Sequence, residues 1–282
     1  MRVADYDPLY IAARSVLLDA LEAFGPQLGA VIVVGAQAVY LRTGDADISV
    51  APYTTDADLA LAPDDLADEP HIEDLMRGAR FLPDGQQPGA WIKQVRVGDA
   101  KVDIPVDIMV PEALAPEGGR RSVRIEPHDK MAMRKAPGLE GVVIDNDRMN
   151  VGTLDGKDVR SIDVRVAGPA ALMVAKLHKL NDRVKAGRAD RIADKDAADV
   201  FRLMQATPVI ALLERLRPLL THSMAGQPSS AAVELLGGLF GAARSPGVVM
   251  AVDALRVAVP PERVEAVCTS FTREILLGLP GH

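Results

Sequence analysis

The sequence predicts an α/β (α+β) fold: a mixed β-sheet flanked by helices, followed by a C-terminal helical domain. A β-branched run at 30–34 leads directly through Gly35 into a helix-like segment, and segments 91–97 and 102–110 alternate as a hairpin does. From Gly168-Pro169 onward, apolar residues recur at helical spacing. We therefore expect two domains, 1–167 and 168–282.

In the first domain, helices are marked by apolar residues at 3.6-residue spacing, and strands by β-branched or alternating runs between turn residues. Pro105 restricts its strand to an edge or a bulge on one side, because proline cannot donate a ladder hydrogen bond. The predicted helices are 8–24, 36–42 and 71–77, and the predicted strands are 30–34, 56–61, 91–97, 102–110, one near 141–144 and one at 162–166.

The second domain has no strand-like run. Its apolar periodicity predicts helices at 170–180, 193–204, 208–220, 230–239 and 261–277.

Bulk composition excludes several classes of protein. The formal charge of −7 argues against indiscriminate binding to nucleic acid, although local basic clusters can override it. The single cysteine, Cys268, excludes an internal disulfide and a zinc–cysteine site. No apolar run reaches the ~20 residues that span a bilayer, and the N-terminal segment lacks the plan of a signal peptide. We expect a cytoplasmic protein that does not bind membranes.

Three aspartates form the candidate metal site. Asp56 and Asp58 point to one face because side chains alternate along a strand, and Asp107 can close the cluster from a neighbouring strand. Asp103 has the same parity as Asp107 and is the alternative third carboxylate. Converging carboxylates repel each other unless a cation neutralises them, so this pattern predicts one or two Mg²⁺ ions. Their alternative interpretation is a solvated strand edge.

The glycine turn before this pair adds a phosphate site. A strand, Gly35 and a helix in succession present backbone N–H groups at the helix start, where phosphate is favoured. Arg120 and Arg121 follow the Asp107 strand and are candidates to grip nucleotide phosphates or an RNA backbone. A solvated loop is the competing interpretation of these arginines.

These motifs resemble the DNA polymerase beta-like nucleotidyltransferases. The resemblance is carried by VVGAQAVYLRTG (33–44), TTDADLAL (54–61) and VDIPVDIMV (102–110). Within that superfamily the motif sequences are most similar to those of the AbiEii-like nucleotidyltransferase toxins of bacterial toxin–antitoxin systems. ALMVAKLHKLNDR (171–183) and RIADKDAADVFRL (191–203) match that family's helical motifs. The resemblance covers about residues 28 to 205.

The resemblance implies a nucleotidyltransferase fold whose helical domain closes the active-site cleft. It places Gly35 and Ala36 at the triphosphate, although the family has Gly or Ser at the second position. It makes Asp56, Asp58 and Asp107 metal ligands, with Asp107 as candidate base. Lys176 would contact phosphates and Asp196 would belong to the second motif; the alignment can also slide to Lys179 or to Asp199. The alternative interpretations are a snorkelling, solvated Lys176 and a surface ion-pair stripe formed by Asp196 and Asp199.

The function implied is Mg²⁺-dependent transfer of a nucleoside monophosphate from a nucleoside triphosphate (NTP) to an acceptor hydroxyl. By resemblance the acceptor is the 3′ end of a tRNA or another RNA, and a cognate antitoxin is the protein partner. A protein or small-molecule acceptor is equally compatible with the residues. The competing classes are a catalytically silent nucleotidyltransferase-like binding module and a nucleotide-sugar glycosyltransferase, which has no use for Gly35.

Overall fold

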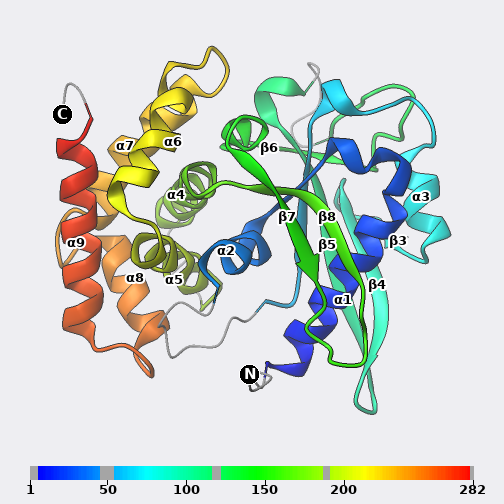
Figure 1. Ribbon diagram of the computed structural model, residues 1–282, viewed down its shortest axis with the longest axis horizontal. Helices are drawn as coiled ribbons and strands as arrows, with labels where there is room; N and C mark the ends of the chain where they lie inside the picture. Colours follow the sequence, from blue (N-terminus) through cyan, green and yellow to red (C-terminus); the bar gives the residue numbers. More distant parts are fainter. Residues whose placement is uncertain (1–5, 45–53, 116–121, 187–190, 280–282) are drawn as a thin grey trace. The chain divides into compact units, whose positions relative to one another are not determined.

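The structure is a computed structural model that describes residues 6–44, 54–115, 122–186 and 191–279, without the side chains of 191–194 (Figure 1). The chain forms two compact units. Unit 1 is drawn from residues 1–38, 51–139 and 146–167, and unit 2 from 39–50, 140–145 and 168–282. Unit 2 thus takes the chain after Ala167 together with two short segments of the first half.

Unit 1 is built on a mixed eight-stranded sheet, in the order β3-β4-β5-β2-β1-β8-β7 with β6 paired to β5. The pairs β1–β2, β3–β4, β4–β5 and β7–β8 are antiparallel, whereas β1–β8, β2–β5 and β5–β6 are parallel. The fold class expected from the sequence is therefore confirmed. The strands are β1 (Val31–Val34), β2 (Ala57–Leu61), β3 (Leu82–Pro83), β4 (Ala90–Val97), β5 (Ala100–Pro111), β6 (Arg134–Ala136), β7 (Asn146–Gly152) and β8 (Ser161–Ala167).

Helix α1 (Pro8–Ala23) covers part of this sheet. It begins where the Asp7 side chain accepts a hydrogen bond from the Leu9 N–H at 2.8 Å, with proline at the first helical position. It contacts β2, β4, β5 and β8 (Figure 1). Its leucines Leu17, Leu18 and Leu21 are fully buried, and each stabilises the fold by roughly 1.5–3 kcal/mol. Helix α3 (Ile72–Gly78) packs beside α1.

The centre of the sheet leads into helix α2 (Gly35–Thr43). All four residues of β1 are buried, and α2 starts at the next residue. Strand β2 lies antiparallel to β1 and parallel to β5, so it sits between them. Pro105 pairs with Ile92 of β4 on one side, while the pairing with β2 begins only at Val106, which agrees with the restriction that proline imposes.

Unit 2 is a helical bundle. Helix α4 contacts α5, α6 and α7, and α9 contacts α5, α6, α7 and α8 (Figure 1). One whole face of α4 is buried, including Leu172, Leu177 and Leu180. The helices are α4 (Pro169–Lys185), α5 (Arg191–Ala206), α6 (Val209–Thr221), α7 (Gly226–Phe240), α8 (Pro246–Leu255) and α9 (Pro261–Leu277).

One strand prediction is wrong. The strand predicted near 141–144 is not formed: Glu140–Val143 are a 3-10 helix, and Gly141 there packs closely on Leu219 and Ala171. Close packing outweighs β propensity at this position. The strand lies just after it, as β7, whose mostly polar side chains at the sheet edge gave no apolar pattern.

None of the described helices combines the length and the apolar character needed to cross a bilayer. A cytoplasmic location stays a prediction.

Candidate functional site

Gly35 and Asp58 form the tightest part of the predicted site. Gly35 opens α2 with φ +69°, a conformation that side chains rarely adopt. A Cβ placed on Gly35 would overlap the Asp58 carboxylate, with Cγ only 2.6 Å away. Asp58 therefore lies directly over the start of a helix, and only glycine leaves room for its carboxylate there.

Asp107 lies beside Asp58. The two are register partners on the parallel strands β2 and β5, so their side chains leave the same face of the sheet. The neighbouring Ala57, Leu59, Val106 and Ile108 are fully buried, as alternation requires. Asp103 instead lies exposed towards the hairpin turn, accepting a hydrogen bond from Gln94 at 3.1 Å. Of the two candidates for the third carboxylate, the register favours Asp107.

Arg134 engages the Asp107 carboxylate. Its NH2 group lies 2.7 Å from Asp107 Oδ2, and both side chains are partly exposed, at 26% and 32%. The sequence predicts a metal cation at the Asp107 carboxylate. In the structure the guanidinium of Arg134, which is also a cation, contacts that carboxylate.

Asp56 lies immediately before β2 and is held by buried polar groups. Its carboxylate accepts a hydrogen bond from the Thr54 hydroxyl. Its backbone carbonyl accepts one from Gln37 Nε2 at 3.0 Å. Gln37 is 1% exposed, and its Oε1 accepts a hydrogen bond from Arg14 Nε at 2.8 Å. The segment that leads into β2 is therefore fixed by α1 and α2.

Asp58 and Asp107 fit a hard cation by their chemistry, and the absence of a side chain at Gly35 leaves room for the Asp58 carboxylate at the helix start. Carboxylate oxygens are the ligands that Mg²⁺ prefers, and Asp58 and Asp107 share a face. In the described part of the chain, however, no three acidic, histidine or cysteine side chains converge closely enough to hold one ion. The assignment of Asp56, Asp58 and Asp107 to a single metal site stays a prediction, and joint ligation requires their side chains to rotate.

Lys176 and Asp196, the helical residues of the predicted site, lie together in unit 2. Lys176 Nζ is 2.7 Å from Asp196 Oδ1 and 2.6 Å from Asp199 Oδ2. All three residues are at most 5% exposed. The aspartates are therefore not a surface ion-pair stripe, and Lys176 is not a solvated lysine; the aspartates hold Lys176 in place.

Electrostatics keeps this cluster charged. Burial by itself would lower the pKa of Lys176, but the charges of Asp196 and Asp199 outweigh it and raise that pKa. Burial would likewise raise the pKa of Asp196, but Lys176 and Lys179 outweigh it and lower that pKa. Both groups are ionised at neutral pH, and a phosphate role for Lys176 requires one of its aspartate contacts to open.

The remaining predicted residues differ in accessibility. Lys179 is 53% exposed at its side chain and lies 3.2 Å from Asp196. Ala36, in the first turn of α2, is 6% exposed. Arg120 and Arg121 lie outside the described residues.

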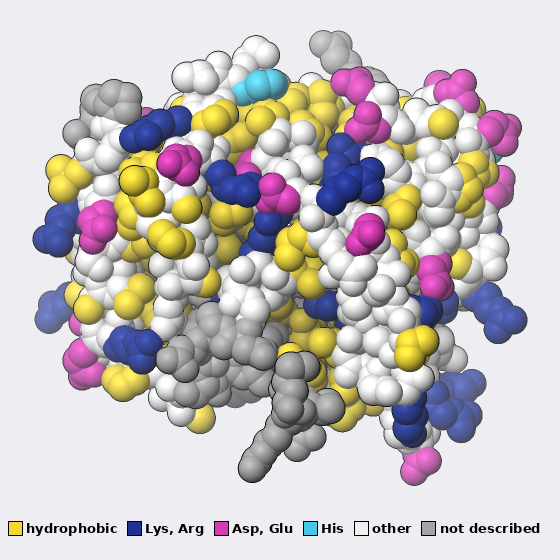
Figure 2. Space-filling view, in the orientation of Figure 1, with side chains coloured by type: hydrophobic (Ala, Val, Ile, Leu, Met, Phe, Trp, Pro, Cys, Tyr) yellow, Lys and Arg dark blue, Asp and Glu magenta, His cyan; other side chains and the backbone are white. Residues whose placement is uncertain are grey.

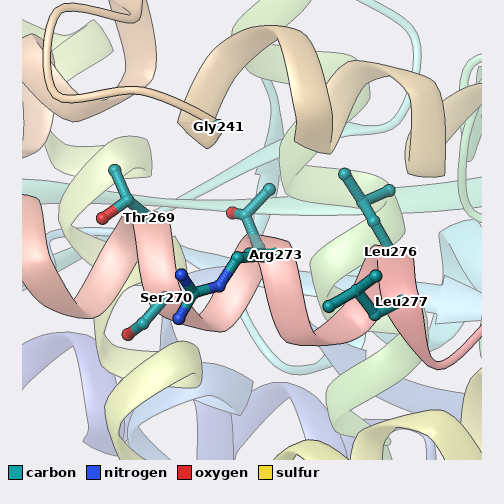
Figure 3. Close-up of a pocket in the computed structure, with 7 residues that line it drawn as sticks. Gly241, Thr269, Ser270, Arg273, Leu276 and Leu277 are labelled. Carbon is teal, nitrogen blue, oxygen red and sulfur yellow. The ribbon is translucent and has the colours of Figure 1, made fainter.

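A groove of about 440 Å³ opens on unit 2, along α9 (Figure 3). Two of its three lining hydroxyls bond to the preceding helical turn: Thr269 donates to Glu265 O at 2.8 Å and Ser270 to Ala266 O at 2.7 Å. Such bonds to the preceding helical turn are ordinary for Ser and Thr. The third, Thr272 Oγ1, is buried and has no hydrogen-bond partner among the described residues. The groove offers an arginine, Arg273, and apolar leucines, but no catalytic arrangement.

The face shown in Figure 2 mixes Lys and Arg side chains with Asp and Glu, and apolar atoms lie between them.

Sequence reasoning missed Arg134, Gln37, Thr54 and Arg14. Thr54 and Gln37 lie within the motif segments 54–61 and 33–44. Gln37 could have been noticed there, because it is a polar residue among apolar neighbours in the predicted helix. Arg134 stands 27 residues after Asp107, in a region that the sequence shows only as a loop.

Comparison with protein-family models, with curated proteins and with solved structures finds no match.

Proposed function

We propose that this protein is a Mg²⁺-dependent nucleotidyltransferase that moves a nucleoside monophosphate from an NTP to an acceptor hydroxyl and releases pyrophosphate. The observation that carries the proposal is the placement of Asp58 over Gly35 at the start of α2, with Asp107 beside it in register. It joins a helix terminus suited to phosphate with two carboxylates suited to a cation.

The residues of unit 1 take the following roles. The start of α2 at Gly35 and Ala36 receives triphosphate oxygens. Asp58 and Asp107, together with Asp56, hold the cation, which neutralises charge on the phosphates and on the leaving pyrophosphate. Asp107 is the candidate base that accepts the proton of the acceptor hydroxyl. Gln37 and Thr54 keep Asp56 in place.

In unit 2, Lys176 is the candidate contact to the phosphates, and Asp196 positions it. Lys179, more exposed, is the alternative contact.

The acceptor rests on resemblance alone. By it we propose an RNA acceptor, the 3′ end of a tRNA, and a cognate antitoxin as partner. A protein or a small molecule is chemically equivalent as acceptor, because any hydroxyl can attack the α-phosphate.

A catalytically silent binding module is the second candidate. The ion pair between Asp107 and Arg134 favours it, since that carboxylate is already engaged by a cationic side chain.

The test is label transfer from NTPs to acceptors. The wild-type protein is incubated with Mg²⁺, each NTP labelled at the α-phosphate, and either total RNA or total protein. Monophosphate transfer moves the α-phosphate to the acceptor and releases the γ-phosphate in pyrophosphate, so a γ-labelled NTP should leave no label on the acceptor. Asp58→Asn should abolish transfer.

The matched control is Asp103→Asn, which removes an exposed carboxylate from the same strand as Asp107. It should transfer label as the wild type does, whereas Asp107→Asn should not. Equal transfer by wild type and Asp58→Asn would reject the proposal. Nucleotide binding without transfer to any acceptor would favour the silent module.

A further inference from the structure

Arg134 is built into the sheet next to Asp107. Strand β6 pairs with β5 from Met109 onward, where β4 has ended its own pairing at Asp107. Gly89 occupies the junction with φ +73°, and a Cβ there would lie 2.7 Å from the Arg134 backbone nitrogen. The replacement of β4 by β6 as the neighbour of β5 therefore fixes the Arg134 backbone close to Asp107.

Its side chain, in contrast, is not enclosed. Arg134 is 26% exposed and reaches Asp107 through one nitrogen, NH2, at 2.7 Å from Oδ2. An ion pair of this exposure contributes little to stability and can exchange partners, since water compensates the charges when they separate. The Arg134 backbone is thus fixed in the sheet, while the contact of its side chain with Asp107 can be exchanged.

We propose that Arg134 couples cation binding to triphosphate binding at Asp107. This inference rests on the proposed function. A divalent cation at Asp58 and Asp107 competes with the Arg134 guanidinium for the same carboxylate. A triphosphate offers the displaced guanidinium a new anion, which it can hold through its forked N–H donors.

The consequence is cooperative binding. The cation alone must displace Arg134 into water and binds weakly; the cation together with a triphosphate satisfies both charges and binds tightly. Because linkage is reciprocal, the triphosphate gains as much affinity from the cation as the cation gains from the triphosphate. Arg134 is thus a positioning residue that makes the site respond to the metal–nucleotide complex rather than to free metal.

The experiment measures Mn²⁺ affinity, with free Mn²⁺ followed by electron paramagnetic resonance, with and without an α,β-methylene triphosphate analogue. Arg134→Gln removes the competing charge and should tighten Mn²⁺ binding without analogue by about tenfold, since a unit charge close to a divalent ion repels it even in water. In the same variant, the gain in Mn²⁺ affinity on adding the analogue should fall by a similar factor.

Arg165→Gln is the matched control. Arg165 also lies in unit 1, is 20% exposed and pairs with one aspartate, Asp65, at 2.9 Å. Losing this pair should leave both Mn²⁺ affinities as in the wild type. The single tryptophan, Trp91, is buried in unit 1, so its fluorescence checks that each variant is folded.

Asp58→Asn separates the two ways of failing. If the wild type binds no Mn²⁺ even with the analogue present, or if Asp58→Asn leaves Mn²⁺ binding unchanged, the proposed function and the coupling are both overturned. If Asp58→Asn abolishes Mn²⁺ binding while Arg134→Gln binds Mn²⁺ as the wild type does or more weakly, only the coupling by Arg134 is overturned.

Discussion

Unit 1 and unit 2 each hold aspartates against a cationic side chain, but in opposite environments. In unit 1 the Asp107–Arg134 pair is partly exposed and makes one contact. In unit 2 Lys176 is buried between Asp196 and Asp199, and Arg183 adds a further contact at 3.1 Å. A partly exposed pair can exchange its cation at little cost, whereas separating the buried Lys176 from its aspartates costs much more stability. The Asp107–Arg134 pair is therefore the one suited to exchange its cation, whereas a phosphate role for Lys176 would first have to open one of its buried aspartate contacts.

The strongest way to break this comparison is Lys176→Met. It leaves Asp196 and Asp199 buried without their shared partner and should lower the free energy of unfolding by about 3–5 kcal/mol. Urea unfolding followed by far-ultraviolet circular dichroism measures it, because most of the described helical residues lie in unit 2. Trp91 fluorescence reports unit 1 separately.

Adding Asp196→Asn and Asp199→Asn to Lys176→Met is the control, because it removes the unpaired charges. This triple variant should recover part of the lost stability. A loss below about 1 kcal/mol for Lys176→Met alone would contradict the interpretation of a buried cluster that depends on Lys176.

The second variant, Gly35→Ala, tests the tight packing in unit 1. The alanine would hold an unfavourable positive φ, which costs roughly 1–2 kcal/mol, and its Cβ would push the Asp58 carboxylate aside. We expect a loss of about 2 kcal/mol or more in stability by Trp91 fluorescence, together with a weakened cation site. Gly29→Ala is the control, since a Cβ at Gly29 meets nothing within 4 Å. Similar behaviour of the two variants would refute the close approach of Asp58.

The sequence predicted correctly those features that depend only on local geometry, such as the side-chain direction along one strand. Alternation along a strand was enough to predict that Asp58 leaves the sheet opposite to Ala57 and Leu59, and Gly35 marked the turn. The choice between Asp103 and Asp107 needed the register of β2 against β5, which no local pattern encodes.

Residues whose partners are distant in the chain could not be predicted. Arg134 reaches Asp107 only because β6 takes the place of β4 along β5, a tertiary event with no signature in a three-residue strand. The burial of Asp196 was missed for a similar reason: charged residues at helical spacing look like a solvated face until the neighbouring helix α4 supplies a lysine.

A third prediction uses pH to separate the two units. Burial lowers the pKa of His128, opposed by Glu73 and reinforced by His71. The folded state therefore binds this proton less readily than the unfolded state. Stability from His128 should be complete above pH 6.5 and decrease as the pH falls below that value, by at most about 1.4 kcal/mol per pH unit for one proton. In unit 2 the pKa of Asp196 is lowered, so the stability that this carboxylate contributes is complete above about pH 4 and decreases only below that value.

Unfolding of unit 1, followed by Trp91 fluorescence between pH 5 and 7.5, measures this effect. His128→Gln should remove the dependence, while His71→Gln removes only the reinforcing neighbour and should weaken the dependence without abolishing it. If the dependence persists in His128→Gln, another group titrates and the assignment to His128 is wrong.

The smallest expected effect tests where the cluster of unit 2 ends. Lys179 contacts Asp196 at 3.2 Å, as a member of the same cluster, but its side chain is 53% exposed. Water therefore replaces most of what the contact provides, and Lys179→Met should cost about 0.5 kcal/mol or less by the same urea measurement. Lys176→Met lies only three residues earlier on α4 and affects the same aspartate, but Lys176 is buried and also contacts Asp199, so the contrast tests burial together with this second contact. Equal losses in the two variants would mean that charge number, rather than burial, holds the cluster together, and the distinction drawn between an exchangeable pair in unit 1 and a fixed cluster in unit 2 would fail with it.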